Sequence, residues 1–98
     1  MHQIGQPLPD GARLCERGHH PQLIESRGTP RGQTLIGRAV PPQFHVECVR
    51  CNTATVPALT TEKALKRWNA NRPSINQIPL CDLGLVRQRV FDAIATAA

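Results

Sequence analysis

Residues 44–71, FHVECVRCNTATVPALTTEKALKRWNAN, decide the fold of this 98-residue chain. Apolar and polar side chains alternate over residues 43–49, which predicts a short β-strand. The strand runs into a Cys-x-x-Cys turn formed by Cys48 and Cys51, and a helical pattern follows. Two thiolates at this spacing can bind one tetrahedral zinc ion from a turn. The stretch therefore predicts half of a zinc site between a strand and a helix.

The helix that follows the turn has clear start and stop signals. Thr60 or Thr61 can act as the N-cap, and Glu62 stands in the first turn, where an acidic side chain is favourable. Pro73 ends the helix, because the residue before a proline is disfavoured in the α conformation. The apolar stripe of this helix is Ala64, Leu65 and Trp68.

The other ligands of the zinc site are expected upstream of the turn. Cys15 is followed by His19 and His20, and either spacing lets one cysteine and one histidine share an ion. His19 is preferred, because Pro21 restricts the backbone of His20 to extended conformations. The predicted zinc ligands are Cys15, His19, Cys48 and Cys51, with His20 as the alternative to His19.

Other arrangements of the cysteines and histidines stay open. His45 lies three residues before Cys48 and could enter the site from the strand. Cys81 could also be a ligand, but it is expected to pack as a small apolar side chain at the start of the last helix. In a metal-free domain, the cysteines would simply be buried.

The composition favours a domain that needs a stabilising metal ion. Aromatic residues make up only 3 % of the chain, which also contains nine prolines and seven glycines. Small domains with thin cores usually depend on a metal or on disulfides, and zinc is the expected cofactor here. The first fourteen residues do not resemble a signal segment, so a cytoplasmic location is expected, where disulfides are rare. No apolar run approaches the roughly 18–20 residues of a membrane span, so no membrane association is expected.

The predicted fold class is small α+β, divided into three segments. Residues 1–13 read as a flexible tail, because prolines and glycines interrupt them. Residues 14–73 are expected to form a zinc-ribbon-like β-hairpin or short sheet with a packed helix, with further strands near residues 22–25 and 35–40. Residues 74–98 read as a linker and a C-terminal amphipathic helix.

The C-terminal helix is expected to run from its N-cap, Asp82, to about Ala97. One face is apolar and consists of Leu83, Val86, Val90 and Ile94, with Phe91 at its edge. This face can fold back over the small core, which is the preferred interpretation. The alternative is that residues 82–97 dock a partner or form a homodimer.

The charge of the chain suits a polyanionic or acidic partner. The net charge is +5 and the pI is about 9.7; such a balance describes association rather than fold. The candidate nucleic-acid or partner-binding residues are Arg27, Arg31, Arg38, Arg50, Lys63, Lys66 and Arg67. Phosphate-driven binding to DNA is one reading, and a solvated basic face is the other.

No catalytic constellation emerges, so a non-enzyme is expected. The triplet from His45 to Glu47 is similar to the His-x-Glu of zinc deaminases, but that signature needs its cysteine pair on a separate, later helix. The βαβ pattern around a redox Cys-x-x-Cys is also missing. A zinc ion with four protein ligands leaves no open position for chemistry.

The run VECVRCNTATVPALTTEKALKRWNANRP, residues 46–73, resembles the C-terminal half of the Lar-type restriction-alleviation proteins of phages and prophages. Those zinc-ribbon-like proteins read V-x-C-x-x-C-G, then T-x-x-E-A-I-x-x-W-N-x-R. The matching residues are Val46, Cys48, Cys51, Thr61, Ala64, Leu65, Trp68, Asn69 and Arg72. The first knuckle of the family has a weaker counterpart in residues 15–18 and 21–25.

The chain also departs from the family pattern. The second cysteine of the first knuckle is absent, so a histidine is needed to complete the site. Asn52 replaces the usual glycine, and asparagine tolerates the left-handed conformation expected there. Residues 26–42 are longer than expected, and residues 74–98 have no counterpart.

The resemblance implies an activity against host defence. Family members are associated with relieving type I restriction or enhancing modification, which makes a restriction enzyme the expected partner. A CRISPR effector or the host RNA polymerase would also suit a small basic binder, and the location would be the host cytoplasm. The alternative function is a zinc-stabilised protein that binds nucleic acid or modulates transcription.

Overall fold

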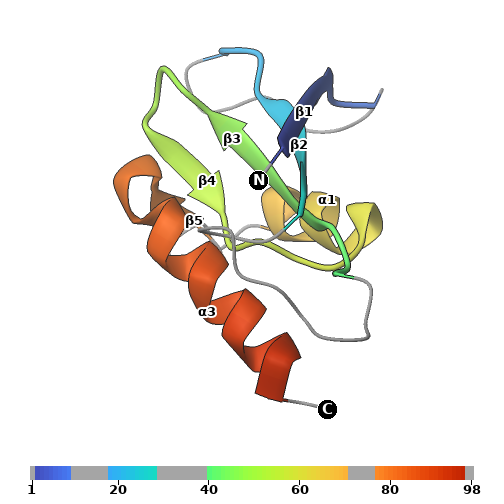
Figure 1. Cartoon of the computed structure of the whole chain (residues 1–98). Helices are drawn as coiled ribbons and strands as arrows, with labels where there is room; N and C mark the ends of the chain where they lie inside the picture. The colour runs from blue at the N-terminus through green and yellow to red at the C-terminus, as the bar shows by residue number, and fades with distance from the viewer. Residues whose placement is uncertain (1, 10–17, 29–39, 71–76, 97–98) are drawn as a thin grey trace.

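A computed structural model of the chain describes residues 2–9, 18–28, 40–70 and 77–96. The strands are β1 (His2–Pro7), β2 (Gln22–Arg27), β3 (Gln43–Cys48), β4 (Thr53–Thr55) and β5 (Gln77–Pro79). The helices are α1 (Thr61–Asn69), the short 3-10 helix η2 (Leu80–Asp82) and α3 (Leu83–Thr96); α1 and α3 are labelled in Figure 1. The predicted small α+β class, with a short sheet, a packed helix and a C-terminal helix, is confirmed.

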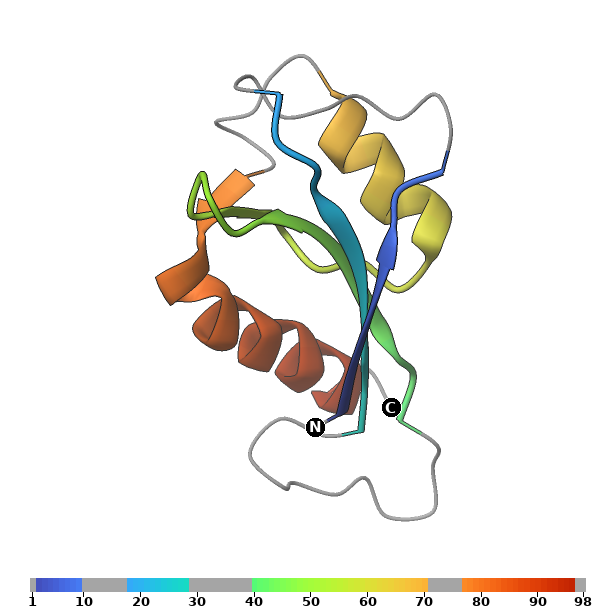
Figure 2. The same ribbon diagram turned by 90° about the horizontal axis from the view of Figure 1, so that it is seen from above.

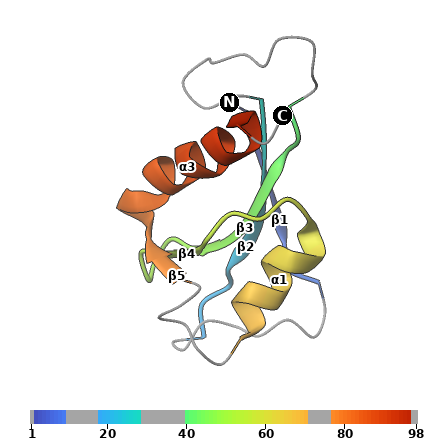
Figure 3. The ribbon, with the colours of Figure 1, turned by 90° about the horizontal axis from the view of Figure 1, so that it is seen from below.

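The five strands form one antiparallel sheet in chain order, β1-β2-β3-β4-β5. In the central pair, Leu23 lies opposite Val46 and Ile24 opposite His45. Successive side chains of a strand point to opposite faces, so the pair Leu23 and Val46 lies on one face of the sheet and the pair Ile24 and His45 on the other. Figures 2 and 3 show α1 on one side of the sheet and α3 on the other, which gives three layers.

The main core lies between the sheet and α1. The buried residues of this cluster are Leu23, Val46, Cys48, Ala58, Ala64 and Trp68. Trp68 is only 1 % exposed. As predicted, a threonine caps α1: the Oγ1 of Thr60 accepts a hydrogen bond of 3.1 Å from the backbone N–H of Lys63. Helix α1 ends at Asn69, before Pro73.

The second face of the sheet is covered by α3. Leu83 and Phe91 are buried, at 7 % and 3 % exposed, so the apolar face of this helix folds back onto the domain. The side chain of Gln43 donates a 3.3 Å hydrogen bond from Nε2 to the carbonyl of Arg87. The predicted N-cap is wrong, because Asp82 already belongs to η2, which runs directly into α3.

Two segments that were expected to be irregular contain strands. The expectation of a flexible tail is wrong for His2–Pro7, which pair with β2 along its whole length, while Leu8 packs against the core. Part of the expected linker, Gln77–Pro79, pairs with β4 as β5. In both cases the partner strand supplies the backbone hydrogen bonds that the sequence of the segment alone does not predict. The strand expected near residues 35–40 lies almost entirely outside the described residues.

Candidate metal centre

His19, Cys48 and Cys51 bring their ligand atoms together at one end of the sheet. These atoms all lie within 4.8 Å of one another. The Nδ1 atom of His19 lies 3.3 Å from the Sγ of Cys51 and 3.7 Å from the Sγ of Cys48. With bonds of ~2.3 Å to sulfur and ~2.0–2.1 Å to nitrogen, a tetrahedral zinc ion separates N and S by about 3.6 Å. The three side chains therefore fit one face of a zinc tetrahedron.

Each ligand is positioned by a local feature of the backbone. Cys48 is the last residue of β3, and Cys51 follows in the turn to β4. The turn is closed by a hydrogen bond of 3.1 Å from Asn52 N–H to the carbonyl of Val49. Asn52 has a φ of 56°, the left-handed conformation expected at this position. On the other side, Gly18, with a φ of 75°, leads the chain into His19 just before β2.

The cluster is joined to the hydrophobic core through Cys48. This cysteine is 2 % exposed and belongs to the same buried cluster as Trp68, whereas His19 and Cys51 are half-buried. A metal ion here would hold the segment before β2 to the end of β3. Because such ligands come together only when the chain folds, metal binding would contribute directly to folding stability.

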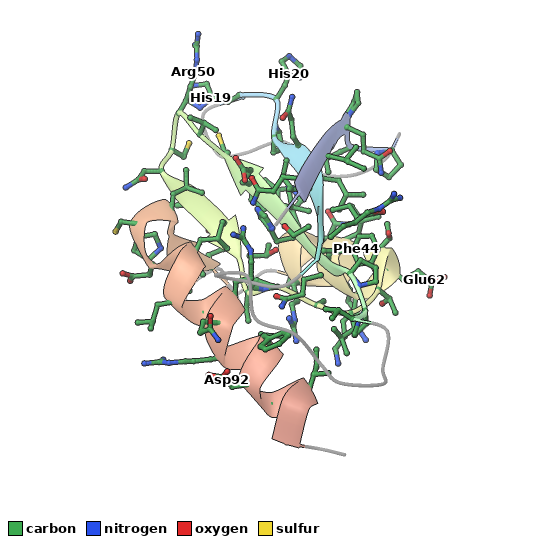
Figure 4. All side chains as sticks on the ribbon, viewed as in Figure 1. His19, His20, Phe44, Arg50, Glu62 and Asp92 are labelled. Atoms are coloured by element: carbon green, nitrogen blue, oxygen red, sulfur yellow. The ribbon has the colours of Figure 1, made fainter. Side chains whose placement is uncertain are left out.

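Three of the four predicted ligands are thus brought together, and the fourth, Cys15, lies outside the described residues. His20 is exposed and is not part of the cluster. Figure 4 shows His19 and His20 at the same end of the molecule as Arg50. The choice of zinc for this candidate site rests on its nitrogen and sulfur donors, which are typical zinc ligands.

His45 and Cys81 do not join this cluster among the described residues. His45 is fully buried, because β3 directs it to the face opposite Cys48, beneath α3. Cys81 is exposed, and its Sγ lies 3.8 Å from the Oδ1 of Asp82. The expected apolar packing of Cys81 is therefore wrong, since η2 turns this residue toward solvent.

A partly buried polar cluster that the sequence did not predict, formed by His45, Glu47 and Arg87, lies on the face of the sheet that α3 covers. His45 Nε2 and Glu47 Oε1 are 2.8 Å apart. The hydrogen bond from His45 lowers the pKa of Glu47, an effect that partial burial opposes and that the charges of His45 and Arg87 reinforce. Burial lowers the pKa of Arg87, and the charge of Glu47 counteracts it. Among the described residues, His45 Nδ1 and two guanidinium nitrogens of Arg87 are buried without a hydrogen-bond partner.

A pocket of about 500 Å³ borders the metal cluster between residues 18–22 and 47–50. Both His19 and Cys48 line it, together with the carboxylate-bearing Glu47. His19 is half-buried and lines this pocket, so a metal ion bound to it would be reachable by a small chelator. Removal of a metal ion under mild conditions is therefore a practical test of this centre.

The described members of the basic set that was expected to form a binding surface lie on three separate segments, β2, the turn after β3, and α1. Arg50 is exposed in the turn between β3 and β4. Arg27 lies at the opposite end of β2 from the metal cluster and forms an ion pair with Glu25. Lys63, Lys66 and Arg67 are all carried by α1, and Arg31 and Arg38 lie outside the described residues.

Comparison with protein-family models, with curated proteins and with solved structures finds no match for this chain. Within the ranges that the structure describes, neither α1 nor α3 combines the length and the apolar character of a membrane-crossing helix. Fold and site together define a small α+β protein with a candidate metal centre of one histidine and two cysteines.

Proposed function

We propose that this chain is a zinc-binding accessory protein that binds and antagonises a host defence complex, in the manner of restriction alleviation. The observation that carries the proposal is the cluster of His19, Cys48 and Cys51, built on the same stretch that resembles the restriction-alleviation family. In this proposal Cys15 supplies the fourth ligand, and the zinc ion is structural. A closed site of four protein ligands fastens the fold and leaves no open position on the metal for catalysis.

The proposed partner is a type I restriction enzyme of the host, and the proposed location is the host cytoplasm. The resemblance of residues 46–73 supports this partner, and the net charge of +5 suits an acidic patch on the surface of a partner protein. A CRISPR effector or the RNA polymerase is the alternative target within the same proposal. Inhibition of a restriction enzyme, of a CRISPR effector or of the RNA polymerase would each change a different property of the host cell. Phenotypic assays can therefore distinguish the three targets.

A plating assay tests this function. The protein is expressed in a host with a type I restriction system, which is then challenged with unmodified phage. The proposal predicts a higher plating efficiency with the wild-type protein and with His20→Ala, and the loss of this gain with His19→Ala. His20→Ala is a matched control, because His20 is the exposed neighbour that stays outside the cluster. If wild-type protein produced at a verified level leaves plating unchanged, the restriction-linked function is refuted.

Direct binding to nucleic acid is the second candidate function, and the strongly basic composition favours it. A protein held by phosphates should bind duplex DNA at low salt and lose affinity steeply as salt rises. The separation of Arg27, Arg50 and the basic residues of α1 on the fold argues for a weaker, diffuse contact. If a fluorescence-anisotropy titration with duplex DNA shows no binding even at low salt, this candidate is excluded.

A further inference from the structure

The structure has an apolar groove at the end of the molecule away from the metal cluster. Its volume is about 540 Å³, and it is formed by three segments: residues 56–60, one side of α1 and one side of α3. Lys63 and Arg67 line it from α1, one helical turn apart. Val90 and Ile94 line it from α3 with the same spacing. The two helices therefore present regular walls, one with cations and one without charge.

The cationic wall is held in place by the fold. Nη1 of Arg67 donates two hydrogen bonds of 2.8 Å, to the carbonyls of Val56 and Pro57. A guanidinium fixed in this way loses little conformational freedom on binding, which favours recognition of an anionic group. Leu59, at the edge of the groove, is 47 % exposed, an unusual position for a large apolar side chain in so small a core.

No acidic residue lines the groove among the described parts of the chain. The two nearest acidic neighbours in sequence, Glu62 and Asp92, are exposed, and Figure 4 places them on the outer parts of α1 and α3. Asp92 accepts a hydrogen bond of 2.9 Å from Gln88 Nε2 along its own helix. In the described part of the chain, the groove thus combines apolar walls with two cationic side chains and no acidic lining residue.

We propose that this groove docks an acidic amphipathic helix of a partner protein, with its apolar face on Leu59, Val90 and Ile94 and its carboxylates beside Lys63 and Arg67. Helices commonly bind in apolar grooves through side chains one turn apart, and both walls have that spacing. Opposite charges at the rim set the orientation of the helix and speed its association. This surface is separate from the metal centre, and its assignment does not depend on the restriction-linked role.

The test uses a fluorescein-labelled synthetic helix of leucine and glutamate, with leucines at helical spacing, and the purified full-length protein. A second peptide, with lysine in place of glutamate, controls for apolar binding alone. The expected result is saturable binding of the acidic peptide, at least about tenfold tighter than that of the basic peptide, because like charges would meet at the rim. Failure of the acidic peptide to bind, or equal binding of both peptides, overturns the proposal.

Two matched pairs of variants locate the binding surface. Lys63→Glu and Lys66→Glu change the same charge on the same helix, but only Lys63 lines the groove. Leu59→Asp and Leu85→Asp alter side chains of similar exposure, 47 % and 50 %, and only Leu59 lines the groove. We expect roughly tenfold weaker peptide binding for the groove member of each pair and a change below about threefold for its control.

Circular dichroism of all four variants tests whether each is folded, which separates loss of the surface from loss of structure. Equal losses within each pair would show binding to net charge or to exposed apolar groups in general, and would overturn the proposal. Sedimentation of the protein alone gives the remaining outcome. A dimer that Leu59→Asp dissociates and Leu85→Asp leaves intact would make a second copy of this chain the occupant, in place of an acidic partner helix.

Discussion

Truncation of Trp68 to alanine should remove a large part of the stability of this domain. Trp68 is 1 % exposed and packs in the cluster that joins α1 to β2 and β3. Replacing a buried tryptophan by alanine costs about 3–5 kcal/mol, the sum of lost burial and the cavity left behind. Domains of this size are stable by only about 5–15 kcal/mol in total. The variant should therefore lose a substantial fraction of the total stability of the domain.

Urea unfolding followed by far-ultraviolet circular dichroism, in the presence of zinc, measures this change. The control is Leu85→Ala on α3, where the side chain is 50 % exposed and the expected change lies within about 0.5 kcal/mol. The midpoint of Trp68→Ala should fall far below that of the wild-type protein, whereas the midpoint of Leu85→Ala should stay close to it. A loss below about 1 kcal/mol for Trp68→Ala would refute the assignment of the main core to the α1 side of the sheet.

Further substitutions test the cap, the turn and the partly buried polar cluster. Thr60→Ala should cost about 1 kcal/mol by urea unfolding, and Thr60→Ser should restore most of it, because the cap bond to Lys63 N–H needs only a hydroxyl. At Asn52, with its φ of 56°, glycine should be tolerated, whereas valine should cost about 1–2 kcal/mol in the same assay. The pKa of Glu47 is lower in the folded protein than in the unfolded chain. Glu47 therefore stabilises the fold at any pH above its unfolded pKa. This contribution is lost as pH falls through the folded pKa. The free energy of unfolding should therefore fall more steeply on acidification below about pH 4.5 for wild type than for Glu47→Gln, and equal slopes would contradict the pairing with His45.

The parts of the fold that the sequence predicted are those with a strong local pattern. β3 has a clear period of two, and α1 has a cap, an apolar stripe and a proline beyond its end. The places of Cys48 at the end of β3 and of Cys51 in the turn after it could be predicted from these elements. The metal cluster could be anticipated because its ligands are chemically distinctive and lie at the ends of predictable elements.

The parts that the sequence did not predict depend on contacts distant along the chain. β4 and β5 have three residues each, too few to show a period, and β1 is a strand because β2 accepts it as a partner. The alternation over residues 43–49 predicted β3 but not the burial of its polar residues Gln43 and His45, whose face is covered by α3, some forty residues later. No pattern within β3 itself could signal this burial.

Zinc content is the most direct test of the metal centre on which this account rests. The purified wild-type protein, His19→Ala and His20→Ala are each dialysed extensively against metal-free buffer, which removes loosely bound ions, and are analysed for metal by mass spectrometry. About one zinc ion per chain is expected in the wild type and in His20→Ala, and much less in His19→Ala, which lacks one corner of the tetrahedron. A wild-type protein without zinc, or a His19→Ala variant that retains it while His20→Ala does not, would contradict the proposed centre.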